Sequence, residues 1–112
     1  MAQRAISRLE YFKSHYLPRL REKFKPKIVL LFGSFARGEA VDTSDVDVIV
    51  VSERFQGVPF PLRAYHVLQE LDVRHAIEFF CYTPEEFDRK KKEIGIVQTA
   101  ISEGVFLVKD QL

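Results

Sequence analysis

One stretch, residues 27–51, restricts the possible folds of this 112-residue chain more than any other part of it. It holds two short apolar runs, KIVLLF and VDVIVV, separated by a Gly-Ser turn and a polar loop. Apolar runs of this length, rich in β-branched residues and bounded by turn residues, are typical of strands that are covered on both faces. The stretch therefore predicts the centre of a small sheet.

Helical patterns around this stretch supply the elements that would cover the sheet. Apolar residues recur every three or four positions over residues 2–24, which predicts a helix that Pro18 splits or kinks and that Lys25-Pro26 ends. We expect three more helices. The first spans 62–72, with Leu62, Tyr65, Leu68 and Leu71 inward, the second spans 84–93 after a capping box at Thr83, and the third spans 96–103 and ends at Gly104. Two more strands are expected at 76–82 and 105–108. The predicted fold class is α+β, a small mixed sheet backed by helices.

Composition is typical of an ordinary soluble protein with one domain. The chain is 46% apolar and 29% charged, and its 17 basic and 16 acidic residues nearly cancel, which argues against a nucleic-acid partner. The one cysteine, Cys81, excludes an intrachain disulfide and a cysteine-based zinc site, and is interpreted as a small buried residue. The sequence shows neither an apolar leader nor a run of about 18 apolar residues, so we expect a cytoplasmic protein that does not span the membrane.

Two aspartates at the start of the second apolar run are the first candidate site. Asp45 and Asp47 are two positions apart, and on a strand this spacing places both carboxylates on one face. Like charges this close repel, and a divalent cation relieves the repulsion. The alternative is the polar start of a surface strand, although an acid inside VDVIVV is costly to bury. Two roles are open for Thr43 and Ser44: their side chains cap the loop before Asp45, or their hydroxyl groups contact phosphates.

Glu78 is the third candidate, because it is the one charged residue in the apolar strand AIEFFCY. If this strand lies beside VDVIVV, Glu78 completes a group of three carboxylates with Asp45 and Asp47. Oxygen ligands without histidine or cysteine favour Mg²⁺ or Mn²⁺ over zinc. The alternative is an edge-strand glutamate that pairs with a nearby arginine.

The Gly-Ser turn after the first strand is a candidate phosphate cradle. Gly33 allows a ligand to approach the backbone, and Ser34 can cap a short helix reaching Gly38. Arg37, one helical turn further on, is within reach of a triphosphate oxygen. The alternatives are a simple turn with its cap and a solvated arginine.

Taken together, these motifs resemble the DNA polymerase β-like nucleotidyltransferase superfamily. Its pattern is an apolar strand, Gly-Ser, a short spacer and Asp-x-Asp, with a third carboxylate on a later strand. The segment GSFARGEAVDTSDVD matches every fixed position of GSxARGxxxxxSDxD, the pattern of the small members called minimal nucleotidyltransferases. One difference is that Glu78 stands where the wider superfamily commonly has aspartate.

The resemblance implies a polymerase β-like fold and a reaction that uses two Mg²⁺ ions, or Mn²⁺, with ATP as substrate. A hydroxyl attacks the α-phosphorus, pyrophosphate leaves, and AMP is transferred. By this resemblance Gly33 and Ser34 hold the triphosphate, Asp45 and Asp47 bind both metals, and Glu78 binds the catalytic metal and takes the proton of the acceptor.

The resemblance also implies a protein partner. Minimal nucleotidyltransferases often act as the antitoxin of a small all-helical HEPN-type toxin, which they silence by transferring AMP to a tyrosine hydroxyl; this is the leading hypothesis. The alternative is a non-catalytic binding module that neutralises or scaffolds a helical partner, or forms a homo-oligomer, through an apolar surface that includes Phe55, Phe60, Phe79, Phe80 and Phe87. Transfer to an antibiotic or to RNA is a weaker third hypothesis, because neither a second domain nor a basic groove is evident.

Overall fold

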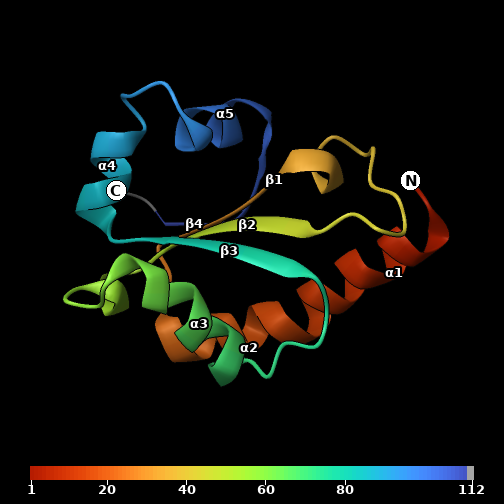
Figure 1. The fold of residues 1–112 in the computed structure, drawn as a ribbon, viewed down its shortest axis with the longest axis horizontal. Coiled ribbons are helices and arrows are strands. Elements are labelled where there is room, and N and C mark those ends of the chain that lie inside the picture. The colour runs from red at the N-terminus through yellow and green to blue at the C-terminus, as the bar shows by residue number, and fades with distance from the viewer. Residues whose placement is uncertain (111–112) are drawn as a thin grey trace.

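A computed structural model describes residues 1–110 and shows a four-stranded mixed sheet with helices on both faces (Figure 1). The strand order is β3-β2-β1-β4, and β1 is antiparallel to both of its neighbours, whereas β2 and β3 are parallel. The strands are β1 (Ile28–Phe32), β2 (Val46–Val51), β3 (Ile77–Tyr82) and β4 (Val105–Lys109). The predicted α+β class and all four predicted strands are confirmed.

The helices form two layers that enclose the sheet (Figure 1). One layer consists of α1 (Gln3–Tyr11), a π-helical turn (Phe12–Tyr16), α2 (Leu17–Phe24) and α3 (Phe60–Glu70), and the other of α4 (Pro84–Lys90) and α5 (Ile96–Glu103). Short 3-10 turns, Gly33–Phe35 and Glu53–Phe55, follow β1 and β2. Within residues 1–110, none of the helices has the length and apolarity needed to cross a lipid bilayer.

The N-terminal helix divides where the sequence predicted. Pro18 is the second residue of α2, and the turn before it is π-helical, with the Leu17 N–H donating to the Phe12 carbonyl. Proline has no N–H and its ring needs room beside the preceding turn, which the wider π-helical turn provides. Lys25 then ends α2 in the left-handed conformation, with φ 45°.

The sheet separates two apolar cores. Side chains of β1 alternate between them, so that Val29 and Leu31 face α1–α3 while Leu30 faces α4 and α5. Cys81 lies in the larger core, as predicted, and burial raises the pKa of its thiol to about 12. Of the five phenylalanines proposed for an interface, Phe55, Phe79 and Phe87 are core residues, Phe80 is partly buried, and Phe60 is 50% exposed.

The predicted inner face of α3 is wrong at two positions. Leu62 and Tyr65 are about half exposed, and Arg63 is buried in their place. The Arg63 guanidinium makes two hydrogen bonds to Glu86, at 2.6 and 3.2 Å, and donates to the carbonyls of Val58 and Cys81. These four acceptors compensate the cost of burying the charge, so the helix turns a cation inward.

The helix ends around α4 and α5 differ in detail from the predictions. The capping box at Thr83 is confirmed, with Glu86 as its second member, but α4 ends at Lys90 rather than at residue 93. Gly104 ends α5 in an extended conformation rather than a left-handed one. A Cβ there would lie 2.4 Å from the Ala100 carbonyl oxygen and 2.7 Å from the Leu31 carbonyl oxygen, so glycine is needed for close approach to β1.

Candidate active site

The turn after β1 brings the backbone of Gly33 against the side chain of Asp47. Gly33 has φ +74°, and a Cβ on it would lie 2.5 Å from Asp47 Oδ2. Both the positive φ and the missing side chain are therefore required at this position. The sequence predicted that Gly33 lets a phosphate approach the backbone; the structure shows the Asp47 carboxylate close to it, and the phosphate role stays a prediction.

Ser34 does not cap the turn, contrary to the prediction. The 3-10 turn Gly33–Phe35 begins after Phe32, which offers no side-chain hydrogen bond, and Ser34 is inside the turn. A serine caps a helix from the position before it, so the early start of this turn at Gly33 rules out that role. The Ser34 carbonyl instead accepts from the Glu39 N–H at 2.9 Å and closes the turn.

Pairing of β2 with β3 places two of the predicted carboxylates side by side. Asp47 and Glu78 are register partners on the parallel strands, so their side chains leave the same face of the sheet, toward the α4 and α5 layer. Figure 1 shows β2 and β3 starting next to each other at the end of the sheet that the turn after β1 reaches. Asp45 precedes β2 and is exposed, and Glu78 is exposed on an edge strand.

Three charged groups at this end of the sheet act on Asp47. Burial, followed by the charges of Glu78 and Asp45, raises the pKa of Asp47 above its usual range, and the charge of Arg37 lowers it in part. Asp47 is half-buried in an otherwise apolar strand, and the protein compensates its ionised form only in part, through Arg37. A cation next to this carboxylate would supply the rest of the compensation.

The oxygen donors fit a hard divalent cation, but they are not arranged around one. Among residues 1–110, no three side chains of His, Cys, Asp or Glu stand as a ready set of ligands. Asp47 is fixed by its strand and by contact with Gly33, whereas Asp45 and Glu78 are exposed and can rotate toward an ion. Carboxylates alone, without histidine or cysteine, are the donors that Mg²⁺ and Mn²⁺ prefer.

The loop before Asp45 is held by a residue that the sequence analysis missed. Arg8 of α1 donates to three carbonyls of this loop, to Val41 at 3.0 Å, to Asp42 at 2.9 Å and to Ser44. The signal in the sequence is that Arg8 follows Ala5 by three residues and precedes Phe12 by four, which places a charge on the buried stripe of the helix.

Ser44 and Arg37 are bound to other parts of the protein. The Ser44 hydroxyl accepts from the Val41 N–H at 2.9 Å, in line with the loop-capping alternative. Arg37 forms ion pairs with Glu39 at 2.7 Å and with Glu103, the last residue of α5, at 3.0 Å. Its guanidinium is close enough to lower the pKa of Asp47, but it is paired with the carboxylates of Glu39 and Glu103.

Comparison with known families shows to which family the chain belongs. The family model described as a nucleotidyltransferase domain matches residues 13–103, which include the Gly-Ser turn and all three carboxylates. The chain belongs to this family. The family implies a nucleotide substrate and a divalent metal for its members.

Several relatives share more than the motif. Protein adenylyltransferase MntA of Thermococcus cleftensis is 26% identical over 107 residues, which cover 96% of this chain and all of that protein. The Methanocaldococcus jannaschii protein MJ0126, whose name also contains protein adenylyltransferase, is 34% identical over 47 residues. That match covers 42% of this chain and spans about half (48%) of the relative.

Two solved structures share the fold of this nucleotidyltransferase. A crystal structure from Sulfolobus solfataricus, described as a nucleotidyltransferase, has a TM-score of 0.67 and 24% identity, and covers 96% of this chain and 85% of its own. A toxin-antitoxin crystal structure with AMP-PNP has a TM-score of 0.57 and 19% identity, and covers 88% and 74%. Both support the polymerase β-like fold that the sequence motifs implied.

Proposed function

We propose that this nucleotidyltransferase transfers AMP from ATP to a hydroxyl group on a partner protein, in a reaction that depends on Mg²⁺. The observation that carries the proposal is the position of Asp47, in register with Glu78 and in contact with Gly33. The names of the relatives, which include protein adenylyltransferase in two archaea, support AMP as the transferred group.

The residues of the site have separate roles in this proposal. Asp45, Asp47 and Glu78 would hold Mg²⁺, which when bound supplies charge neutralisation at the phosphates. The turn at Gly33 and Ser34 positions the triphosphate through its backbone N–H groups. Glu78 accepts the proton of the acceptor hydroxyl, whose oxygen attacks the α-phosphorus while the bond from that phosphorus to the leaving pyrophosphate breaks.

Arg37 changes partners in this mechanism. In the structure it pairs with Glu39 and Glu103, both exposed enough for water to compete for the pairing. A triphosphate carries more negative charge than either carboxylate, so it draws the guanidinium away from them. Arg37 then binds the phosphates, as the sequence suggested.

The proposed acceptor is a tyrosine hydroxyl of a small all-helical HEPN-type toxin. The support is the shared fold with a toxin-antitoxin structure that holds AMP-PNP. In this arrangement the nucleotidyltransferase is the antitoxin, and adenylylation silences its partner.

A second candidate function is neutralisation of a partner by binding alone. Phe60, Leu62 and Tyr65 are each about half exposed along α3, which gives the chain an apolar surface that catalysis does not use. Under this alternative the carboxylates have no essential role.

One experiment separates the two functions. Purified partner, ATP and Mg²⁺ are incubated with wild type or with the double variant Asp45→Asn, Asp47→Asn, and the partner is weighed by mass spectrometry. We expect the mass of one or more AMP units on the partner with wild type and none with the variant. Neutralisation of the partner by the double variant, without added mass, would favour binding alone.

Isothermal titration of ATP into the same two proteins, with and without Mg²⁺, tests the nucleotide site before any partner is known. We expect binding that requires Mg²⁺ and that the double variant loses. Equal binding by both proteins would show that Asp45 and Asp47 do not serve the nucleotide.

A further inference from the structure

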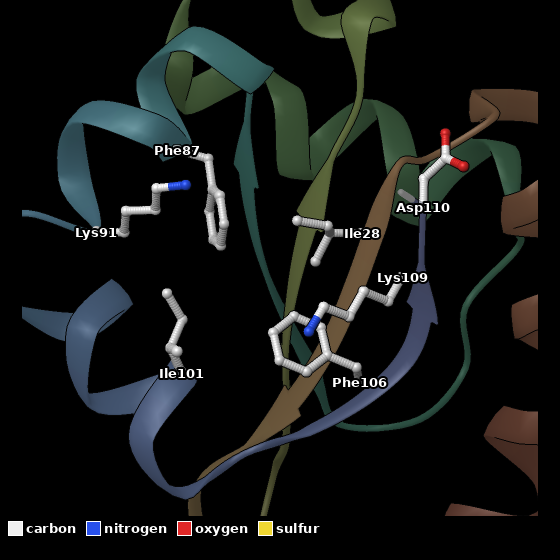
Figure 2. Close-up of a pocket in the computed structure, with 7 residues that line it drawn as sticks. All are labelled: Ile28, Phe87, Lys91, Ile101, Phe106, Lys109 and Asp110. Atoms are coloured by element: carbon white, nitrogen blue, oxygen red, sulfur yellow. The ribbon is translucent and has the colours of Figure 1, made fainter. Parts of the chain in front are cut away.

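A cavity of about 620 Å³ lies between the sheet and the helices on the face that also carries Asp47, but at the other end of β1 (Figure 2). Its walls are the apolar side chains of Ile28, Phe87, Ile101 and Phe106. Ile28 is the first residue of β1, whereas Phe32, the register partner of Asp47, is the last. Four residues of strand separate the two places by about 13 Å, so the cavity is not part of the candidate active site.

Two lysines lie at the rim of this apolar cavity. Figure 2 shows Lys91, the residue after α4, beside the Phe87 ring, and Lys109 of β4 with its ammonium group at the Phe106 ring. Lys109 Nζ lies 4.6 Å from the centre of the Phe106 ring, and Lys91 Nζ lies 3.0 Å from Asp88 Oδ1. Asp110, at the margin, is directed away from both.

The strand that borders the cavity has an open edge. β4 is the last strand of the sheet and, in the part of the chain that the structure describes, pairs with β1 alone. Its sequence, VFLVK, contains no proline and no charge before its last residue, and its one irregularity is a register shift in the pairing with β1 between Val29 and Leu30. Phe106 and Lys109 of this strand face the cavity, so a side chain of an added strand on the same face would reach it.

We infer that β4 and the cavity form a docking site for an extended acidic segment of a partner protein. The segment adds to β4 as an antiparallel strand, and one apolar side chain enters the cavity. Aspartate or glutamate residues two positions before and after it, which leave the same face of the strand, meet Lys91 and Lys109. Main-chain hydrogen bonds to the edge provide affinity, and the cavity and the two lysines select the sequence. A second copy of β4 does not fit this rim, because it would bring another Lys109 and no acid within the strand.

The site is tested with a synthetic peptide and no nucleotide. The probe is a fluorescein-labelled peptide, Glu-Ile-Phe-Val-Asp, whose two acids share one strand face with the phenylalanine, and its binding is followed by fluorescence polarisation and by amide NMR shifts of the protein. We expect saturable binding with shifts at residues 105–109. The same peptide with lysine in place of its acids, and the same peptide with alternate amides N-methylated, should each bind at least about tenfold more weakly. An unaltered affinity for either peptide overturns the proposal.

Protein variants locate the binding. Lys91→Glu with Lys109→Glu should weaken binding of the acidic peptide at least about tenfold, while Lys13→Glu with Lys25→Glu, which changes the net charge equally at exposed positions away from the cavity, should not. Equal weakening by both pairs would mean that net charge alone attracts the peptide, and this would overturn the proposal. If the protein dimerised through β4 and the dimer competed with the peptide, the occupant of the site would be a second copy of the chain, and the proposal would also be overturned.

The proposed docking site and the proposed AMP transfer can be tested independently of each other. Asp45→Asn with Asp47→Asn should leave peptide binding unchanged while it abolishes transfer. Loss of peptide binding in that double variant would show that the peptide occupies the carboxylate site, and would overturn the assignment to the cavity.

Discussion

Asp47 shows how a single residue can be poorly suited to the fold and well suited to the chemistry. Its strand is otherwise apolar, and its carboxylate faces Glu78, Asp45 and the backbone of Gly33. The folded protein therefore favours the protonated form of Asp47, whereas binding of a cation requires the ionised form. In the absence of a cation, the ionised Asp47 side chain therefore lowers the stability of the folded protein, although cation binding requires this charge.

Replacing Asp47 with asparagine should stabilise the protein in the absence of divalent cations. Because folding raises the pKa of Asp47, its contribution to stability is greatest at low pH and is lost as the pH rises through the folded-state pKa. We expect Asp47→Asn to raise the Tm by on the order of a few degrees at pH 8 in EDTA, and by less at pH 4. Thermal melts across this range check it, with exposed Asp42→Asn as the control. A Tm that falls in the variant at pH 8 would contradict it.

Gly33→Ala should be much more damaging than the same change at Gly38. Both residues have positive φ, +74° and +73°, so both pay the same backbone strain, about 1–2 kcal/mol. Only at Gly33 would the new Cβ meet Asp47 Oδ2, and at Gly38 it would meet nothing within 4 Å. We expect a further loss of about 1–3 kcal/mol for Gly33→Ala in urea unfolding.

A second variant shows whether that loss comes from the contact. Asp47→Ala removes the carboxylate that the new methyl group would meet, so it should restore part of the stability of Gly33→Ala in a double-mutant cycle. Purely additive effects would mean that Gly33 and Asp47 are not in contact.

At the level of elements, α1 is the support for the loop that carries Asp45. The three carbonyls that Arg8 binds are in a segment with no regular structure of its own, and the Arg8 guanidinium also lies 5.4 Å from the centre of the Phe35 ring, in the turn after β1. A helix distant in sequence thus fixes both the loop and the Gly-Ser turn.

Arg8→Met should loosen this loop while leaving the rest of the protein folded. Methionine keeps much of the apolar side chain but leaves three carbonyls without their donor, and we expect a loss of about 1–3 kcal/mol. Hydrogen exchange of amides in residues 41–45 should accelerate more than that of β1 and β2. The matched control is exposed Arg4→Met in the same helix. Uniform acceleration over the whole chain would contradict a local role.

At the scale of the whole molecule, the two cores are expected to unfold together. They share one sheet, whose central strands β1 and β2 contribute side chains to both. Opening either helix layer exposes apolar residues of the same strands, so neither layer is stable alone.

Phe12→Ala tests this coupling. Phe12 is fully buried in the larger core, and its truncation should cost about 3–5 kcal/mol. Urea unfolding followed by far-UV circular dichroism and by tyrosine fluorescence should still give one coincident transition, at lower urea. Phe60→Ala, at a half-exposed position, should shift it far less. Two separate transitions would show that the layers unfold independently.

Local sequence signals predicted most of the elements and part of the candidate site. The capping box at Thr83 and the proline at position 18 act within one helical turn, so their effects can be read from neighbouring residues. Asp47 and Glu78 stood out because each was a charge in an apolar strand. The inner face of α3 could not be predicted in this way, because the acceptors that allow Arg63 to be buried come from a loop, β3 and α4.

Short stretches of sequence are enough to predict the strands, the main helices, the Gly-Ser turn and the acids that stand out within apolar runs, because each depends on a few consecutive residues. The folded chain alone established that β3 lies parallel beside β2, which makes Asp47 and Glu78 neighbours. It also decided that Asp47 touches Gly33 and that Arg8 holds the loop before Asp45. These contacts join residues up to 36 positions apart, and which distant surfaces meet is set by how the whole chain buries its two apolar cores.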